Sequence, residues 1–171
     1  ADLIIGGNAS YTDASYSEEY IQPTGLGGVI GVNNPLAPTS LYTDPERVVS
    51  VKGLQMLRIP KSKAAFYANL TKDAFGGTVD YLITYAWTDS INWDDSQISI
   101  DRSPQFDRMD FKVTWRNNEE DLEVMAFINN IQDKIGVRNM WRQGEEQGYQ
   151  RSIAPTLPRM AGIGFTYKFG E

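Results

Sequence analysis

The stretch RMAGIGFTYKF, residues 159–169, decides the fold class, because its residues alternate between two unlike faces. From Ala161 onward every second residue is apolar or aromatic, and the residues between them are Gly, Gly, Thr and Lys. A period of two residues is the pattern of a β-strand and not of a helix. A strand that ends in alternate rings is typical of a membrane barrel, which turns this face to lipid and places rings at the bilayer interface.

The same alternation recurs in five earlier segments. These predicted strands are residues 3–12, 63–71, 78–88, 109–116 and 122–128. In 78–88, one face would carry five apolar or aromatic residues, namely Val79, Tyr81, Ile83, Tyr85 and Trp87. In 109–116, the face opposite the apolar residues carries three charges, those of Asp110, Lys112 and Arg116. This face would be exposed to solvent in a soluble protein or would face the lumen in a barrel.

The connections between these strands alternate in length. Residues 17–53, 90–105 and 130–158 are long and polar, whereas 72–77 and 117–120 are short and rich in turn residues. An antiparallel meander with long loops at one end and tight turns at the other is typical of an outer-membrane barrel. A strand of about 10 residues, tilted by about 45°, rises about 23 Å, close to the apolar band of about 25 Å. We therefore predict an all-β fold, an antiparallel up-and-down transmembrane β-barrel.

The composition excludes several functions. The chain has 171 residues, a net charge of −6, and neither Cys nor His. Acidic and basic residues are mixed, which disfavours nucleic acid as a partner. Without His the usual general base is missing, so we predict no enzyme and no catalytic residue. Asp94 and Asp95 lack the spaced ligands of a calcium loop, and we expect neither a metal nor a cofactor.

Three segments resemble the C-terminal part of TonB-dependent outer-membrane receptors. The first is YTDA at 11–14, followed by a long loop and RIPK at 58–61, which would open a strand. The second is NNIQDK at 129–134, similar to the family's Asn-Leu-Phe-Asp-Lys element. The third runs from LPRM at 157–160 to YKF at 167–169. The order and spacing of the three segments extend the resemblance over nearly the whole chain.

This resemblance implies a 22-stranded barrel with an N-terminal plug in its lumen. Residues 1–171 would supply about six C-terminal strands, while the plug and the earlier strands lie outside this sequence. Six strands leave two open edges, which lipid does not tolerate, so we expect the chain to be the C-terminal part of a longer receptor. Gly164, Tyr167 and Phe169 resemble the terminal signal that the barrel assembly machinery recognises, although two residues follow Phe169.

The function implied is TonB-dependent uptake of a scarce substrate across the outer membrane of a Gram-negative bacterium. Family substrates are ferric siderophores, haem, cobalamin and oligosaccharides. The implied partners are outer-membrane lipid, the remainder of the receptor, the barrel assembly machinery and, through the N-terminal part, the TonB complex. On this hypothesis the loop residues Trp93, Trp141, Arg142 and Tyr149 are candidates for substrate binding, because rings and guanidinium groups suit ring and anion recognition.

Two other classes of protein fit the same pattern. One is a small self-contained outer-membrane barrel with a structural or enzymatic role, which would require two further strands within the first long connection, residues 17–53. The other is a soluble β-barrel or β-sandwich that binds a ligand. Dependence on detergent separates the soluble class, since outward rings would make the isolated chain insoluble without it.

Overall fold

The fold is described from a computed structural model, which covers residues 1–18, 21–23, 48–50, 52–94, 101–143 and 150–169. Its main element is one antiparallel sheet of six strands in the order β1-β4-β5-β8-β9-β12. The strands are β1 (Asp2–Tyr11), β4 (Ser62–Ala74), β5 (Gly77–Thr88), β8 (Phe106–Asn117), β9 (Leu122–Asn129) and β12 (Met160–Tyr167). Each pairs with its neighbours along the chain, so the predicted meander and the all-β class are confirmed. Among the described residues, no helix is long and apolar enough to span a membrane.

The register of the six strands places apolar residues on one face of the sheet. One row across all six strands consists of apolar and aromatic residues: Leu3, Leu70, Tyr81, Val113, Ala126 and Ile163. The next row, one residue along, is mixed: Ile4, Asn69, Leu82, Lys112, Phe127 and Gly162. A slip of one residue in any pair would exchange the two faces, so the alternation predicted from the sequence fixes this register.

The sheet is a single layer whose apolar face is uncovered. Within the described residues, the buried hydrophobic residues are Val79 and Met140, at 3% and 4% exposure. Ile163 and Phe165 on the apolar face of β12 are each 81% exposed. A soluble sandwich packs such a face against a second sheet. This sheet therefore needs an apolar environment that the described residues do not supply.

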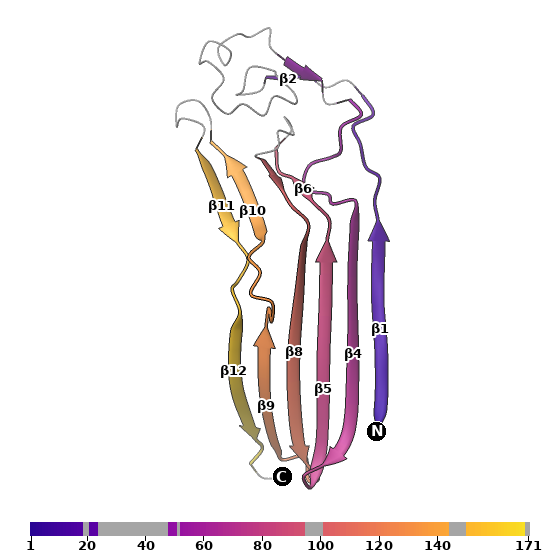
Figure 1. Ribbon diagram of the computed structural model, residues 1–171, viewed down its shortest axis with the longest axis vertical. Helices are drawn as coiled ribbons and strands as arrows, with labels where there is room; N and C mark the ends of the chain where they lie inside the picture. The colour runs from indigo at the N-terminus through magenta and orange to yellow at the C-terminus, as the bar shows by residue number, and fades with distance from the viewer. Residues whose placement is uncertain (19–20, 24–47, 51, 95–100, 144–149, 170–171) are drawn as a thin grey trace.

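The tight turns lie together at one end of the sheet, near the start of β1 and the end of β12 (Figure 1). The first turn consists of Phe75 and Gly76, whose φ values of 54° and 67° are the paired positive values of a two-residue hairpin. The sequence predicts a longer connection over 72–77. It is shorter because residues 72–74 continue β4 and pair with β5.

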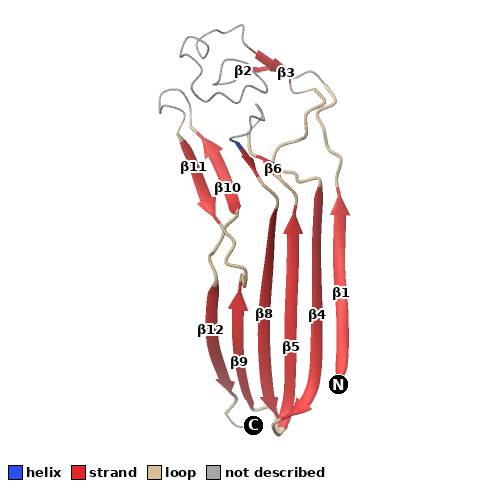
Figure 2. Cartoon of the chain, in the orientation of Figure 1, coloured by secondary structure: helices blue, strands red, loops and turns tan. Residues whose placement is uncertain are grey.

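Three short hairpins lie at the other end, beyond the long strands (Figure 2). They pair β2 (Ile21–Pro23) with β3 (Val48–Ser50), β6 (Ile91–Asn92) with β7 (Arg102–Ser103), and β10 (Val137–Arg142) with β11 (Arg151–Pro155). The sequence predicts long polar connections in these three regions. Their strands are short, and β10 shifts register between Val137 and Asn139, so no sustained period of two marks them.

Candidate functional site

Arg142 joins two hairpins at the long-loop end. Its Nη1 donates to Asp101 Oδ2 at 2.7 Å and its Nη2 to Asp94 Oδ1 at 2.9 Å. Asp94 follows β6 and Asp101 precedes β7, whereas Arg142 ends β10. The side chain of Arg142 is only 7% exposed. The guanidinium therefore holds the β6–β7 and β10–β11 hairpins together as one unit.

Asp101 is the most deeply buried charged residue of this cluster, at 2% exposure. Burial raises the pKa of its carboxyl, and the nearby Arg142 guanidinium opposes that rise. The charge of Asp94 raises this pKa further, and that of Arg151 lowers it. Among the described residues, Asp101 Oδ1 has no hydrogen-bond partner. The ion pair with Arg142 is thus the main compensation for burying this carboxylate.

The structure brings two of the four predicted binding residues into one cluster. The backbone N–H of Trp93 donates to the carbonyl of Asp101 at 2.9 Å, and its indole Nε1 donates to Ser103 Oγ at 3.0 Å. Trp93 and Arg142 therefore share the Asp101 neighbourhood. Trp141 precedes Arg142 on β10 and is 45% exposed. Tyr149 lies outside the described residues.

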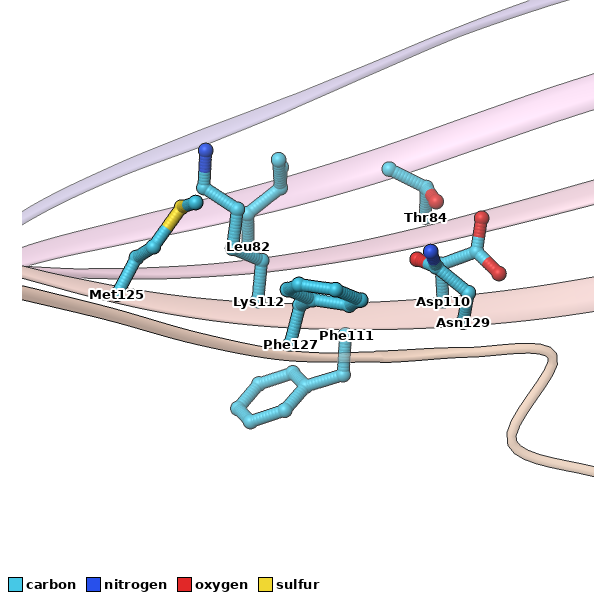
Figure 3. A pocket seen from close by; sticks show the side chains of 8 residues that line it. All are labelled: Leu82, Thr84, Asp110, Phe111, Lys112, Met125, Phe127 and Asn129. Carbon is cyan, nitrogen blue, oxygen red and sulfur yellow. The ribbon is translucent and has the colours of Figure 1, made fainter. Parts of the chain in front are cut away.

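The polar face of the sheet contains a hollow of about 380 Å³ that sequence reasoning did not identify (Figure 3). Its lining comes from β5, β8 and β9 and combines apolar, acidic and basic side chains: Leu82, Thr84, Asp110, Phe111, Lys112, Met125, Phe127 and Asn129. Figure 3 shows the ring of Phe111 on the opposite side of the sheet from Phe127 and Lys112. The alternating charges of 109–116 indicate a polar face, but they do not predict a hollow, because the hollow forms only where β5, β8 and β9 lie side by side.

A chain of hydrogen bonds crosses four strands on the polar face. Thr71 Oγ1 donates to Asp80 Oδ1 at 2.6 Å. Arg116 donates from Nη1 to Asp80 Oδ2 at 2.6 Å and from Nε to Glu123 Oε2 at 2.8 Å. These contacts give the charged side chains partners across β4, β5, β8 and β9. The charged side chains of the polar face therefore pair with one another across the strands, next to the hollow.

The NNIQDK segment forms the junction where the chain leaves β9. Asn130 is 1% exposed, has a positive φ of 55°, and donates from Nδ2 to the carbonyls of Lys134 at 2.8 Å and Leu157 at 3.2 Å. Its Oδ1 accepts from the Lys134 backbone N–H at 3.1 Å. The contact with Leu157 ties this turn to the segment before β12. The sequence marks this segment only by its family resemblance and predicts no role for Asn130.

The predicted assembly residues lie on β12 and just beyond it. The rings of Tyr167 and Phe169 meet edge to face, with centroids 4.8 Å apart and planes at 78°. Gly164 lies on the other face, where a Cβ would come within 2.8 Å of Met125 Cε. The three residues thus occupy both faces of the last strand.

Comparison with known proteins supports the fold. No protein-family model matches this sequence, and no curated protein matches it. Among solved structures, the chain is similar to the ferric yersiniabactin uptake receptor FyuA from Yersinia pestis, with a TM-score of 0.61 and 15% sequence identity. The similarity covers 70% of this chain and 18% of that receptor's chain. At this identity the likeness concerns the fold alone, an antiparallel all-β arrangement shared with part of an uptake receptor.

Proposed function

We propose that this chain is the C-terminal barrel segment of a TonB-dependent outer-membrane receptor. The observation that carries the proposal is the single six-stranded sheet with one uncovered apolar face and one charged face. A transmembrane barrel wall has these two faces, apolar toward lipid and polar toward the lumen. The likeness in fold to part of an uptake receptor and the three resembling sequence segments support the same assignment.

The strand edges favour a larger barrel over a closed six-stranded one. Among the described strands, β1 pairs only with β4 and β12 only with β9. Open backbone edges are not stable in hydrocarbon, so both edges need further strands. In this proposal those strands and the plug come from the rest of the receptor, within a 22-stranded barrel of a Gram-negative outer membrane. The TonB complex would act through the plug-bearing part, and the barrel assembly machinery would insert the whole.

The proposed substrate is a scarce nutrient such as a ferric siderophore, haem, cobalamin or an oligosaccharide. Trp93, Trp141, Arg142 and Tyr149 remain the proposed substrate contacts. Trp141 presents a half-exposed ring, and Arg142 beside it fixes the hairpin that carries this ring. The hollow on the polar face, with Lys112 and Asp110, faces the lumen in this assignment.

Two measurements test this function. Intact mass and fractionation of the protein purified from its own cells should give a species much larger than 19.2 kDa in the outer membrane. A soluble monomer of 19.2 kDa would refute the proposal. Mass spectrometry of ligand co-purified with the full-length receptor then identifies the substrate. Substituting Trp141→Ala should weaken binding of that ligand, whereas Trp87→Phe, on the sheet, should not.

A further inference from the structure

The apolar face of the sheet has a hollow near its tight-turn end. It has a volume of about 460 Å³ and is lined by apolar and aromatic side chains from β5, β8, β9 and the first turn: Phe75, Val79, Tyr81, Val113, Trp115 and Val124. Phe75 lies on the turn itself and is 85% exposed, so the hollow reaches the end of the sheet. The lining suits a hydrocarbon chain lying along the strands.

One wall of this hollow contains a polar group without a partner. The indole Nε1 of Trp115 is covered, and no described residue accepts its hydrogen. Leaving a covered donor without an acceptor is unfavourable, and the indole N–H normally finds a partner. Trp115 therefore marks a place where an oxygen acceptor from outside the described residues would be favourable.

A cation lies beside the same hollow. Lys72 stands directly opposite Val79 in the β4–β5 register, and Val79 stands opposite Trp115 in the β5–β8 register. Directly opposite residues share a face and have Cβ atoms about 5 Å apart. Lys72 is exposed, and no described carboxylate forms an ion pair with it. One row across the sheet thus combines an ammonium group, an apolar hollow and an unsatisfied indole donor.

We propose that this hollow binds one glycerophospholipid. Its acyl chain lies along Tyr81 and Val113, its phosphate meets the Lys72 ammonium, and an ester carbonyl accepts from Trp115 Nε1 after a rotation of the indole. The proposal rests on the membrane location proposed above and adds a defined lipid site to it. An apolar hollow alone would take any hydrocarbon. The Lys72 ammonium favours a molecule with a phosphate, and the Trp115 indole N–H favours one with an acceptor oxygen.

The site is tested by native mass spectrometry of the full-length protein in mild detergent, titrated with dioleoylphosphatidylglycerol. Lys72→Gln should weaken binding of the lipid about tenfold, and Trp115→Phe, which keeps an aromatic ring but removes the N–H, should weaken it several-fold. Lys168→Gln is the matched control, because Lys168 lies at the same end but lines the polar face. It should bind the lipid like the parent protein. Dioleoylglycerol, which lacks phosphate, should bind weakly to the parent and equally weakly to Lys72→Gln.

Three results would overturn the lipid site: unchanged affinity in Lys72→Gln, an equal loss in Lys168→Gln, or dioleoylglycerol binding as tightly as the phospholipid. These results are independent of transport. A protein that takes up substrate while Lys72→Gln binds lipid normally keeps its proposed function and loses the lipid site. A protein that binds the lipid as expected but transports nothing keeps the site and loses the receptor function.

Discussion

The guanidinium of Arg142 lies 2.7 Å from the carboxylate of Asp101, although 41 positions separate the two residues. Both side chains are buried, and they belong to hairpins inserted into different connections of the meander. Removing one partner of a buried ion pair leaves an uncompensated charge, which costs about 3–5 kcal/mol. The pair therefore sets the stability of the outer hairpin unit that carries Trp93 and Trp141.

Arg142→Met should separate the two hairpins without unfolding the sheet. The expected result is a loss of about 3 kcal/mol in the free energy of opening at the Trp93 amide, which donates to the Asp101 carbonyl. Hydrogen exchange measures this quantity. Arg102→Met is the control, because Arg102 makes an exposed hydrogen bond to Ser90 and should lose less than about 1 kcal/mol. Equal losses in the two variants would contradict the role given to Arg142.

The stability of the same unit should depend on pH through Asp101. Burial raises the pKa of this carboxyl in the folded state above its unfolded value, so the folded state binds a proton more readily. Its contribution to stability is therefore fully present below the unfolded pKa and is lost as pH rises through the folded pKa. The opening free energy at the Trp93 amide should fall across that window in the parent protein. In Asp101→Asn this dependence should disappear, and its persistence would assign the effect to another group.

The sequence predicts the sheet better than it predicts the site. The alternation in 78–88 and 159–169 depends only on which residues face the two sides of a strand, and the register follows from it. The Arg142 cluster depends on two hairpins whose strands are too short to show a period. The polar-face hollow depends on Leu82, Lys112 and Phe127 being neighbours across three strands. Both the Arg142 cluster and the hollow depend on residues far apart in the chain, so the spacing of residues in the sequence does not predict either of them.

Asn130→Ala should destabilise the junction between β9 and β12. The change removes the side-chain bonds to Lys134 and Leu157 and leaves alanine at a positive φ, which Asn tolerates better than alanine does. We expect a loss of about 2–4 kcal/mol in the free energy of unfolding, measured by denaturation of the full-length protein in detergent. Asn130→Gly removes the same bonds without the backbone strain and should lose less. If the two variants are equally stable, strain at this position plays no part.

Arg116→Met should weaken the chain of hydrogen bonds across the polar face by a smaller amount. The guanidinium bridges Asp80 and Glu123, but all three side chains are partly exposed, so solvent screens the attraction. We expect a loss of about 1 kcal/mol in unfolding free energy, reduced further at high salt. Lys112→Met, on the same strand and face, is the comparison: Lys112 forms neither ion pair but its charge still attracts Asp80, so its loss should be smaller than that of Arg116. A salt-independent loss would indicate lost packing of the Arg116 side chain and not lost charge.

Gly162→Ala should be destabilising and Gly164→Ala should not, although both place a methyl group on the same face of β12. At position 162 the new Cβ would lie 2.6 Å from the ring of Phe127, whereas at 164 it would meet the flexible end of Met125 at 2.8 Å. Overpacking against a ring costs about 1–3 kcal/mol. Replacing a strand glycine beside a side chain that can move removes an entropic penalty and should be neutral or stabilising.

The measurement is the unfolding free energy of each variant in detergent. It includes the single variant Phe127→Ala and the double variant Gly162→Ala/Phe127→Ala. The double variant should lose less than the sum of the two single losses, because the clash has gone. Gly164→Ala also tests the proposed assembly signal. If this variant is stable once folded but reaches the outer membrane in lower yield, Gly164 acts in recognition by the assembly machinery and not in strand stability. A full additive loss in the double variant would show that Phe127 does not cover Gly162.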